Sequence, residues 1–169
     1  MFVFKGPKEY VNILTQGSVE FANVANNHSY DYGQQGYKDT VTLLEEHGVA
    51  YADRKKYPIF EADGLKIGVY AVAGAYNTAG VAENIKALKK AGADIIIASM
   101  HWGEEYQLEP TSYQKKIAQA LCDMGDVFIH SVIRHCAIHQ RRYLPCQSPH
   151  PTSPRRSSLH FSEEICGRW

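Results

Sequence analysis

An almost unbroken apolar run, ADIIIASM, occupies residues 93–100. A strand with one face in water alternates apolar and polar residues, whereas this run is apolar at nearly every position. Such a run is expected of a strand that is covered on both faces in a parallel sheet. A helix that crosses a membrane needs about 20 apolar residues, and no run in the chain approaches that length. The run therefore predicts the centre of an α/β domain.

Helical and strand patterns alternate along most of the chain, as an α/β architecture with right-handed crossovers requires. Apolar residues at helical spacing predict helices, and short apolar or alternating runs between turn residues predict strands. The pair Asp63-Gly64 separates two such runs and predicts a tight hairpin. The predicted helices are 7–17, 37–47, 81–91 and 113–124, and the predicted strands are 19–24, 58–62, 65–73, 93–100 and one beginning at 126–129.

Residue usage changes abruptly after Ile129. The formal net charge is −4 over residues 1–129 and +4 over residues 130–169, so the overall value of zero is a cancellation. Neutrality gives no reason to expect a nucleic-acid partner. The second part lacks Lys, and Ser, Pro and Arg dominate residues 147–158. We therefore predict a partial folded domain over 1–129 and an aberrant, disordered tail over 130–169.

Two loops follow predicted strands and carry the candidate chemistry. Residues 25–33 read ANNHSYDYG, and residues 101–106 read HWGEEY. In open α/β sheets, functional groups gather beyond the carboxyl ends of the strands. Amide oxygen together with imidazole nitrogen suits a divalent transition metal. The alternative is that Asn, Asp and Gly only form turns and cap the next helix, while the His-Trp pair packs in the interior. Spacing leaves both interpretations open.

Two long motifs allow a more specific interpretation. ANNHSYDYGQQGYKDTVTLLEEHGVAY and, after a strand, SMHWGEEYQLEPTSYQKKIAQALCDMGD closely resemble the bacterial capsule-synthesis protein family of poly-γ-glutamate biosynthesis, the CapA type. The resemblance covers roughly residues 4–129. That family looks like a branch of the calcineurin-like metallophosphoesterases. The resemblance implies an α/β/β/α metallophosphoesterase-like sandwich, here incomplete, with divalent metal ions of the Mn, Fe or Zn class at the strand ends.

The same resemblance assigns roles to individual residues. By position, Asn27 resembles the amide metal ligand of an Asn-His motif, and His101 resembles the histidine ligand that follows the middle strand. His28 resembles the catalytic histidine, which assists the leaving group or holds the anion of the substrate. Asp31 and Glu104 lie inside the matched motifs, and we expect them to shape loops or to position the ligands.

The sequence departs from the family pattern at both ends. The family implies a strand ending in Gly-Asp and an Asn-Leu-Glu-like motif, both expected upstream of Met1, and a Gly-His-Pro-His motif after Ile129. Residues 130–135 read HSVIRH instead. Permitted codons for residues 131–134, read two bases later, give Gly-His-Pro. Our hypothesis is an out-of-frame tail on a fragment. The alternative, a zinc cluster in the tail, lacks the short cysteine pairs of such sites.

The resemblance implies a metal-dependent hydrolase that acts on a phosphoester or a peptide-like γ-glutamyl link. Its expected partner is the anionic capsule polymer or a precursor of it. The alternative is a non-catalytic accessory module that helps to assemble or export the polymer. With ligands missing at both ends, we expect weak metal binding, little turnover and self-association through exposed sheet edges. Full-length relatives resemble membrane-associated or extracellular surface proteins, although the opening residues lack a secretory signal.

Overall fold

The computed structural model describes residues 3–74, 78–104, 107 and 109–133 of the 169-residue chain. Helices and strands alternate along it, so the predicted α/β fold class is confirmed. The helices are η1 (Lys8–Tyr10), α1 (Val11–Gln16), α2 (Gly33–Glu46), α3 (Thr78–Lys90) and α4 (Ser112–Asp123). The strands are β1 (Phe21–Asn23), β2 (Ala50–Ala52), β3 (Ile59–Ala62), β4 (Leu65–Ala73), β5 (Ile95–Trp102) and β6 (Val127–Ile133).

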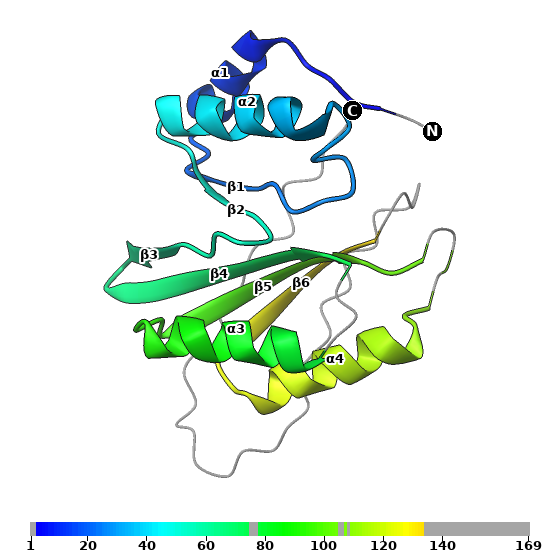
Figure 1. Ribbon diagram of the computed structural model, residues 1–169. Coiled ribbons are helices and arrows are strands. Elements are labelled where there is room, and N and C mark those ends of the chain that lie inside the picture. Colours follow the sequence, from blue (N-terminus) through cyan, green and yellow to red (C-terminus); the bar gives the residue numbers. More distant parts are fainter. Residues whose placement is uncertain (1–2, 75–77, 105–106, 108, 134–169) are drawn as a thin grey trace.

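These elements form four layers (Figure 1). From top to bottom in that view, they are helices α1 and α2, the two-stranded sheet β1-β2, the four-stranded sheet β3-β4-β5-β6, and helices α3 and α4. The described part of the chain therefore has the α/β/β/α layer order that the sequence resemblance implies. Among the described residues, none of the helices combines the length and the apolar character needed to cross a membrane.

The four-stranded sheet is parallel except at one edge. β3 pairs antiparallel with β4 across the turn at Asp63 and Gly64, and β4, β5 and β6 run parallel to one another. Both turn residues have positive φ, 51° and 74°, which is the conformation that a two-residue hairpin favours. The predicted hairpin is therefore present. His101, near the carboxyl end of β5, lies beside Ala73 at the carboxyl end of β4.

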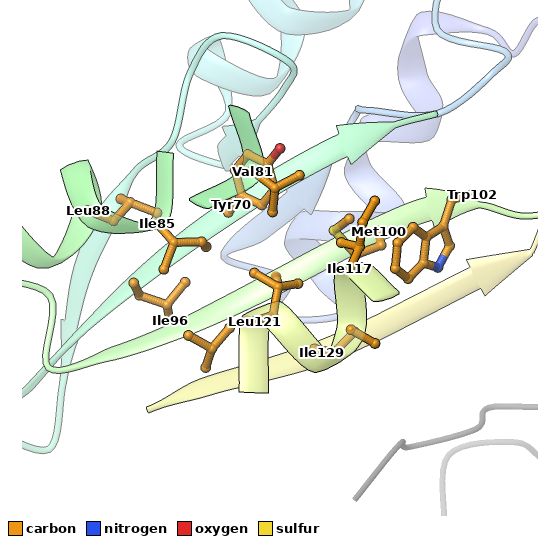
Figure 2. Packing of buried hydrophobic residues seen from close by; sticks show 13 residues of the cluster. Tyr70, Val81, Ile85, Leu88, Ile96, Met100, Trp102, Ile117, Leu121 and Ile129 are labelled. Carbon is orange, nitrogen blue, oxygen red and sulfur yellow. The ribbon is translucent and has the colours of Figure 1, made fainter. Parts of the chain in front are cut away.

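Side chains alternate between the two faces of β5. Ile96, Met100 and Trp102 point toward α3 and α4 and are at most 1% exposed (Figure 2). Ile97 packs on the opposite face, in a separate cluster that includes Val69. The strand is thus covered on both sides, as its apolar sequence predicts. The same alternation places the odd-numbered residues of β5 on the face that looks toward the β1-β2 layer.

The small parallel sheet lies between the large sheet and α2. Ala52 of β2 packs against Val69 and Ala71 of β4 with no exposed surface, and Leu44 of α2 packs on Tyr51 from the other side. This packing fixes the position of β1 above the large sheet. The loop that follows β1 consequently lies near the carboxyl end of β5, where the sequence places its second candidate loop.

Some element bounds differ from the predicted ones. α2 begins at Gly33, four residues before the predicted start, and the short strand β2 was not predicted. β6 continues to Ile133, because it pairs with β5 as far as Trp102. The predicted boundary after Ile129 therefore falls inside a paired strand. Residues 134–169, which make up most of the predicted tail, lie outside the described residues.

Candidate functional site

The loop after β1 is held by its own polar side chains. The backbone N–H of Ala25 donates to Asn23 Oδ1 at 2.7 Å, and the N–H of His28 donates to Asn26 Oδ1 at 2.8 Å. These are the local turns that Asn residues favour. Within the loop 25–33, Asn26 therefore forms a turn as the alternative interpretation has it, while Asn23 is the last residue of β1. The side chain of Asn27 instead reaches across to β5.

The structure brings the three predicted site residues together. Asn27 Oδ1 lies 3.0 Å from His101 Nε2, and Asn27 Nδ2 lies 3.3 Å from His28 Nε2. His28 Nδ1 in turn lies 2.8 Å from Asp31 Oδ2. We refer to Asn27, His28, Asp31 and His101 as the polar cluster. Glu104, the remaining residue to which the sequence analysis gives a role, is exposed in the loop after β5.

The carboxylate of Asp31 is more buried than the imidazole that it faces. Its side chain is 4% exposed and that of His28 is 22% exposed. A buried carboxylate must accept hydrogen bonds to offset its lost hydration. Asp31 Oδ2 accepts from the backbone N–H of Phe4 at 2.8 Å as well as facing the imidazole. The Phe4 ring lies edge-on to His28, with the two ring centroids 4.5 Å apart. The segment before η1 therefore covers one side of the cluster.

The spacing of Asn27 and His101 fits two ligands of one metal ion. Ligand atoms about 2.1 Å from an ion and at right angles to each other are about 3.0 Å apart, the distance observed between Oδ1 and Nε2. Amide oxygen and imidazole nitrogen are accepted by Mn, Fe and Zn. Within the described ranges, no three or more His, Cys, Asp or Glu residues are arranged to hold a metal ion. Asn27 Oδ1 and His101 Nε2 are the candidate ligand atoms of the polar cluster, and both are neutral.

A second polar group lies next to the polar cluster on the same face of β5, and sequence reasoning missed it. Asn23 Nδ2 donates to Ser99 Oγ at 2.6 Å, and Ser99 Oγ lies 3.2 Å from His130 Nδ1. We call Asn23, Ser99 and His130 the serine bridge. Ser99 is hidden in the sequence inside an apolar run, and His130 was assigned to the tail. The detectable signal was the two-residue spacing from Ser99 to His101, which places both on one face.

A partly buried tyrosine–carboxylate pair holds the start of α2. The hydroxyl of Tyr37 donates to Asp53 Oδ2. Burial and this hydrogen bond raise the pKa of Tyr37. Burial acts to raise the pKa of Asp53, but the tyrosine hydroxyl and the backbone N–H groups of Lys55 and Lys56 outweigh it, so the pKa is lowered. Tyr30, in the loop after β1, stacks on the ring of Tyr37. The pair thereby supports the loop that carries the polar cluster.

Comparison with curated proteins finds relatives in two Bacillus species. The chain is 26% identical over 144 residues to the capsule biosynthesis protein CapA of Bacillus anthracis, a match that covers 70% of this chain and 35% of the relative. It is 32% identical over 142 residues to the PGA biosynthesis protein CapA of Bacillus subtilis (strain 168). That match covers 70% of this chain and 37% of the relative. The chain therefore spans about a third of the length of these relatives. No solved structure matches it.

A family model extends the comparison over most of the chain. The model described as Bacterial capsule synthesis protein PGA_cap matches residues 1–143. The matched range contains every strand and helix described above, together with the polar cluster and the serine bridge. The extent of this match shows that the chain belongs to the bacterial capsule synthesis protein family PGA_cap.

Proposed function

We propose that the polar cluster is part of a metal-dependent hydrolase site that acts in capsule biosynthesis. The observation that carries this proposal is the 3.0 Å distance between Asn27 Oδ1 and His101 Nε2 at the carboxyl end of β5. Two neutral ligand atoms at this spacing, one from the loop after β1 and one near the end of β5, are placed to bind one divalent ion in exchange for the hydrogen bond that joins them. The family membership of the chain supports the capsule context.

The cluster residues have different tasks in this proposal. Asn27 and His101 hold the ion, which when bound supplies charge for the scissile group and an activated water. His28 faces Asp31 through Nδ1, so a proton taken up at Nε2 leaves both ring nitrogens protonated. That Nε2 proton is the one available to a leaving group or to the anion of a substrate. His28 is therefore the proposed catalytic residue.

The proposed substrate is a phosphoester or a γ-glutamyl link in the anionic capsule polymer or in a precursor of it. The names of the two relatives, which refer to capsule and PGA biosynthesis, support this class of substrate. The proposed location is the cell surface, where such a polymer is assembled. The chain matches about a third of each relative, so the activity of the complete protein is part of what we propose here.

Manganese broadening of NMR signals tests the metal ligands even if binding is weak. Substoichiometric Mn²⁺ is added to the purified chain, and the side-chain signals of Asn27 and His101 are expected to broaden first. His101→Ala is expected to abolish the broadening at Asn27. His47→Ala is the matched control, because this imidazole is exposed at the end of α2 and bonds to the Leu43 carbonyl. Broadening of Asn27 that is equal in all three proteins would contradict the assignment.

Turnover tests the reaction itself. With bis(p-nitrophenyl) phosphate and Mn²⁺, we expect slow hydrolysis that a chelator abolishes, because the polar cluster supplies only two candidate ligand atoms. His28→Ala is expected to lower kcat by roughly 10²–10⁴-fold, the contribution of a general acid or base, while Mn²⁺ broadening at Asn27 persists. Binding of poly-γ-glutamate with no turnover and no effect of chelator would instead indicate an accessory role in polymer assembly or export.

A further inference from the structure

The hydrogen bonds of the polar cluster run in one direction. The carboxylate of Asp31 can only accept, so the facing atom, His28 Nδ1, must carry a proton. In a neutral imidazole the other nitrogen, Nε2, is then an acceptor. Its neighbour at 3.3 Å is Asn27 Nδ2, which can only donate. The tautomer of His28 is thus matched to the orientation of the Asn27 carboxamide.

The direction continues to β5. Because Asn27 Nδ2 faces His28, Oδ1 faces His101 Nε2 at 3.0 Å, and the imidazole donates to it. Each step therefore places a donor against an acceptor, from His101 to Asn27, from Asn27 to His28 and from His28 to Asp31. The opposite direction would require Asp31 to donate to His28 Nδ1, and the carboxylate has no proton to give.

The position of this carboxylate is itself fixed. Oδ2, the oxygen that faces His28, also accepts the backbone N–H of Phe4 at 2.8 Å, and the side chain is 4% exposed. The Phe4 ring lies against the His28 ring at nearly a right angle, 86°. A buried carboxylate that accepts two hydrogen bonds is held in place and does not rotate freely toward water. The atom that faces it must therefore be a hydrogen-bond donor.

We propose that Asp31 is a positioning residue that sets which atom of Asn27 points toward His101. Asp31 selects the Nδ1–H tautomer of His28, and this tautomer turns the amide nitrogen of Asn27 toward His28 and the amide oxygen toward β5. The inference deepens the proposed function, because only the oxygen of a carboxamide coordinates a metal ion. In this sequence of contacts, Asp31 acts on Asn27 and His101 through His28.

NMR of the metal-free chain tests the proposal. At about pH 8.5, well above the ordinary imidazole pKa of about 6.5, long-range ¹H–¹⁵N spectra are expected to show the Nδ1–H tautomer for His28 and the Nε2–H tautomer for His101. The Asn27 amide protons are expected to give cross-relaxation to the His28 ring. In Asp31→Ala, His28 is expected to change to the Nε2–H tautomer, and the Asn27 amide protons are expected to move their cross-relaxation to the His101 ring.

Two further variants separate this role from folding. Asp39→Ala removes an exposed carboxylate of α2 and is expected to leave both signals unchanged. Asp31→Glu keeps a carboxylate and is expected to restore the Nδ1–H tautomer at least in part. If Asp31→Ala does not fold, the wild-type spectra alone decide the matter. An Nε2–H tautomer of His28 in the wild type overturns the proposal, as does an unchanged Asn27 contact in a folded Asp31→Ala.

The tautomer and cross-relaxation measurements do not depend on metal binding or turnover. Correct tautomers together with no Mn²⁺ broadening would leave the positioning role intact and overturn the proposed function. If both hold, Asp31→Ala is expected to weaken Mn²⁺ binding by roughly 10–100-fold, the usual effect of losing a residue that orients a metal ligand. Asp39→Ala is expected to bind Mn²⁺ as the wild type does.

Discussion

Among single residues, Asp53 shows most directly how the chain stabilises a partly buried carboxylate. One carboxylate oxygen accepts the backbone N–H groups of Lys55 and Lys56, each at 2.6 Å, and the other accepts the hydroxyl of Tyr37. These donors favour the ionised form strongly enough to lower the pKa against the effect of burial. The raised pKa of Tyr37 follows from burial and from the same hydrogen bond. The pair is therefore stable with the acid ionised and the phenol protonated.

We expect Tyr37→Phe to lower the free energy of unfolding by about 2 kcal/mol at pH 7, the range for a hydrogen bond to a charged group. A lowered carboxyl pKa adds stability above the unfolded value of about 3.9, and this contribution disappears as pH falls through the folded pKa. The loss caused by the substitution should therefore be smaller at pH 3 than at pH 7. Urea denaturation at the two pH values measures it.

Tyr30→Phe is the matched control for this prediction. It removes a hydroxyl from the ring that stacks on Tyr37 and leaves the stacking and the Asp53 bond in place. We expect its effect to be within about 0.5 kcal/mol, as for most exposed substitutions. An equal loss in both variants, or a loss from Tyr37→Phe that does not change with pH, would show that the bond to Asp53 contributes little.

Residue positions in the site were predictable where they follow strands. Asn27 and His101 each come at or soon after the end of a predicted strand, where functional groups gather, so both could be singled out from the sequence. Their convergence depends on how two layers pack, because β1 and β5 belong to different sheets. The partner of His28 could not be chosen from the sequence, because Asp31 fits a turn as well as a pairing role. Ser99 was not predictable as a polar contact, since a single Ser in an apolar run is compatible with burial without a partner.

At the scale of elements, α4 shows how backbone groups at both ends of a helix find hydrogen-bond partners. At its start, the Thr111 hydroxyl accepts the N–H of Gln114 at 3.3 Å, and the Gln114 side chain accepts the N–H of Thr111 at 2.9 Å. This reciprocal pair is a capping box. Beyond its end, the ammonium of Lys89 on α3 donates to the carbonyls of Met124 and Gly125 at 2.5 and 2.8 Å. A cation at a helix C-terminus also complements the helix dipole.

Lys89→Met tests the contribution of this contact. The methionine keeps the apolar length of the side chain and removes the charge, so the two carbonyls lose their donor. We expect the free energy of unfolding to fall by about 1–2 kcal/mol, as for hydrogen bonds from a charged group. Lys86→Met, an exposed position one turn earlier on α3, is the control and should change stability by less than about 0.5 kcal/mol. Thermal denaturation with equal losses in both variants contradicts the expectation.

Element bounds were predictable where the pattern was long. The predicted bounds of β4, residues 65–73, agree with the structure, because a turn signal precedes nine residues of strand pattern. The first turn of α2 contains Gly33 and Gly36, and glycine carries no helical signal, so the predicted start came too late. β2 has three residues and exists because it pairs with β1, which is a contact distant in sequence. Short strands of this kind are decided by tertiary packing.

At the scale of the molecule, the serine bridge connects the two sheets. Asn23 lies at the end of β1, while Ser99 and His130 lie side by side on β5 and β6. The polar cluster supplies another polar link between the layers, from Asn27 to His101. Three of the four buried residues in the apolar contact between them are alanines; the cluster consists of Ala25, Ala52, Val69 and Ala71, with Phe21, Phe60 and Ile97 packed against it. Short side chains let the layers approach closely but bury little area each. A polar contact therefore contributes a substantial part of the specificity with which the layers are joined.

We expect Ser99→Ala to loosen the upper layers selectively. Asn23 then loses its acceptor at the interface, and the opening free energy of β1 and β2 should fall by about 1–2 kcal/mol. Amide hydrogen exchange in these strands should become roughly 5–30-fold faster, while exchange in β4 and β5 stays nearly unchanged, as expected for cooperative units of different stability. Ser112→Ala, at an exposed position of α4, is the control. Uniform acceleration throughout the molecule would contradict the role of Ser99 as a local connection.

The hairpin at Asp63 and Gly64 makes the molecule easy to orient on a solid support. This turn lies at the amino end of β4, whereas Ala73 at the other end of the strand is beside His101. The eight steps from Leu65 to Ala73, at about 3.3 Å each, place the turn roughly 26 Å from the polar edge of the sheet. Exposed turn tips accept insertions well. A biotin acceptor sequence inserted there would fix the protein to a sensor chip with the sheet edge that carries His101 directed away from the chip.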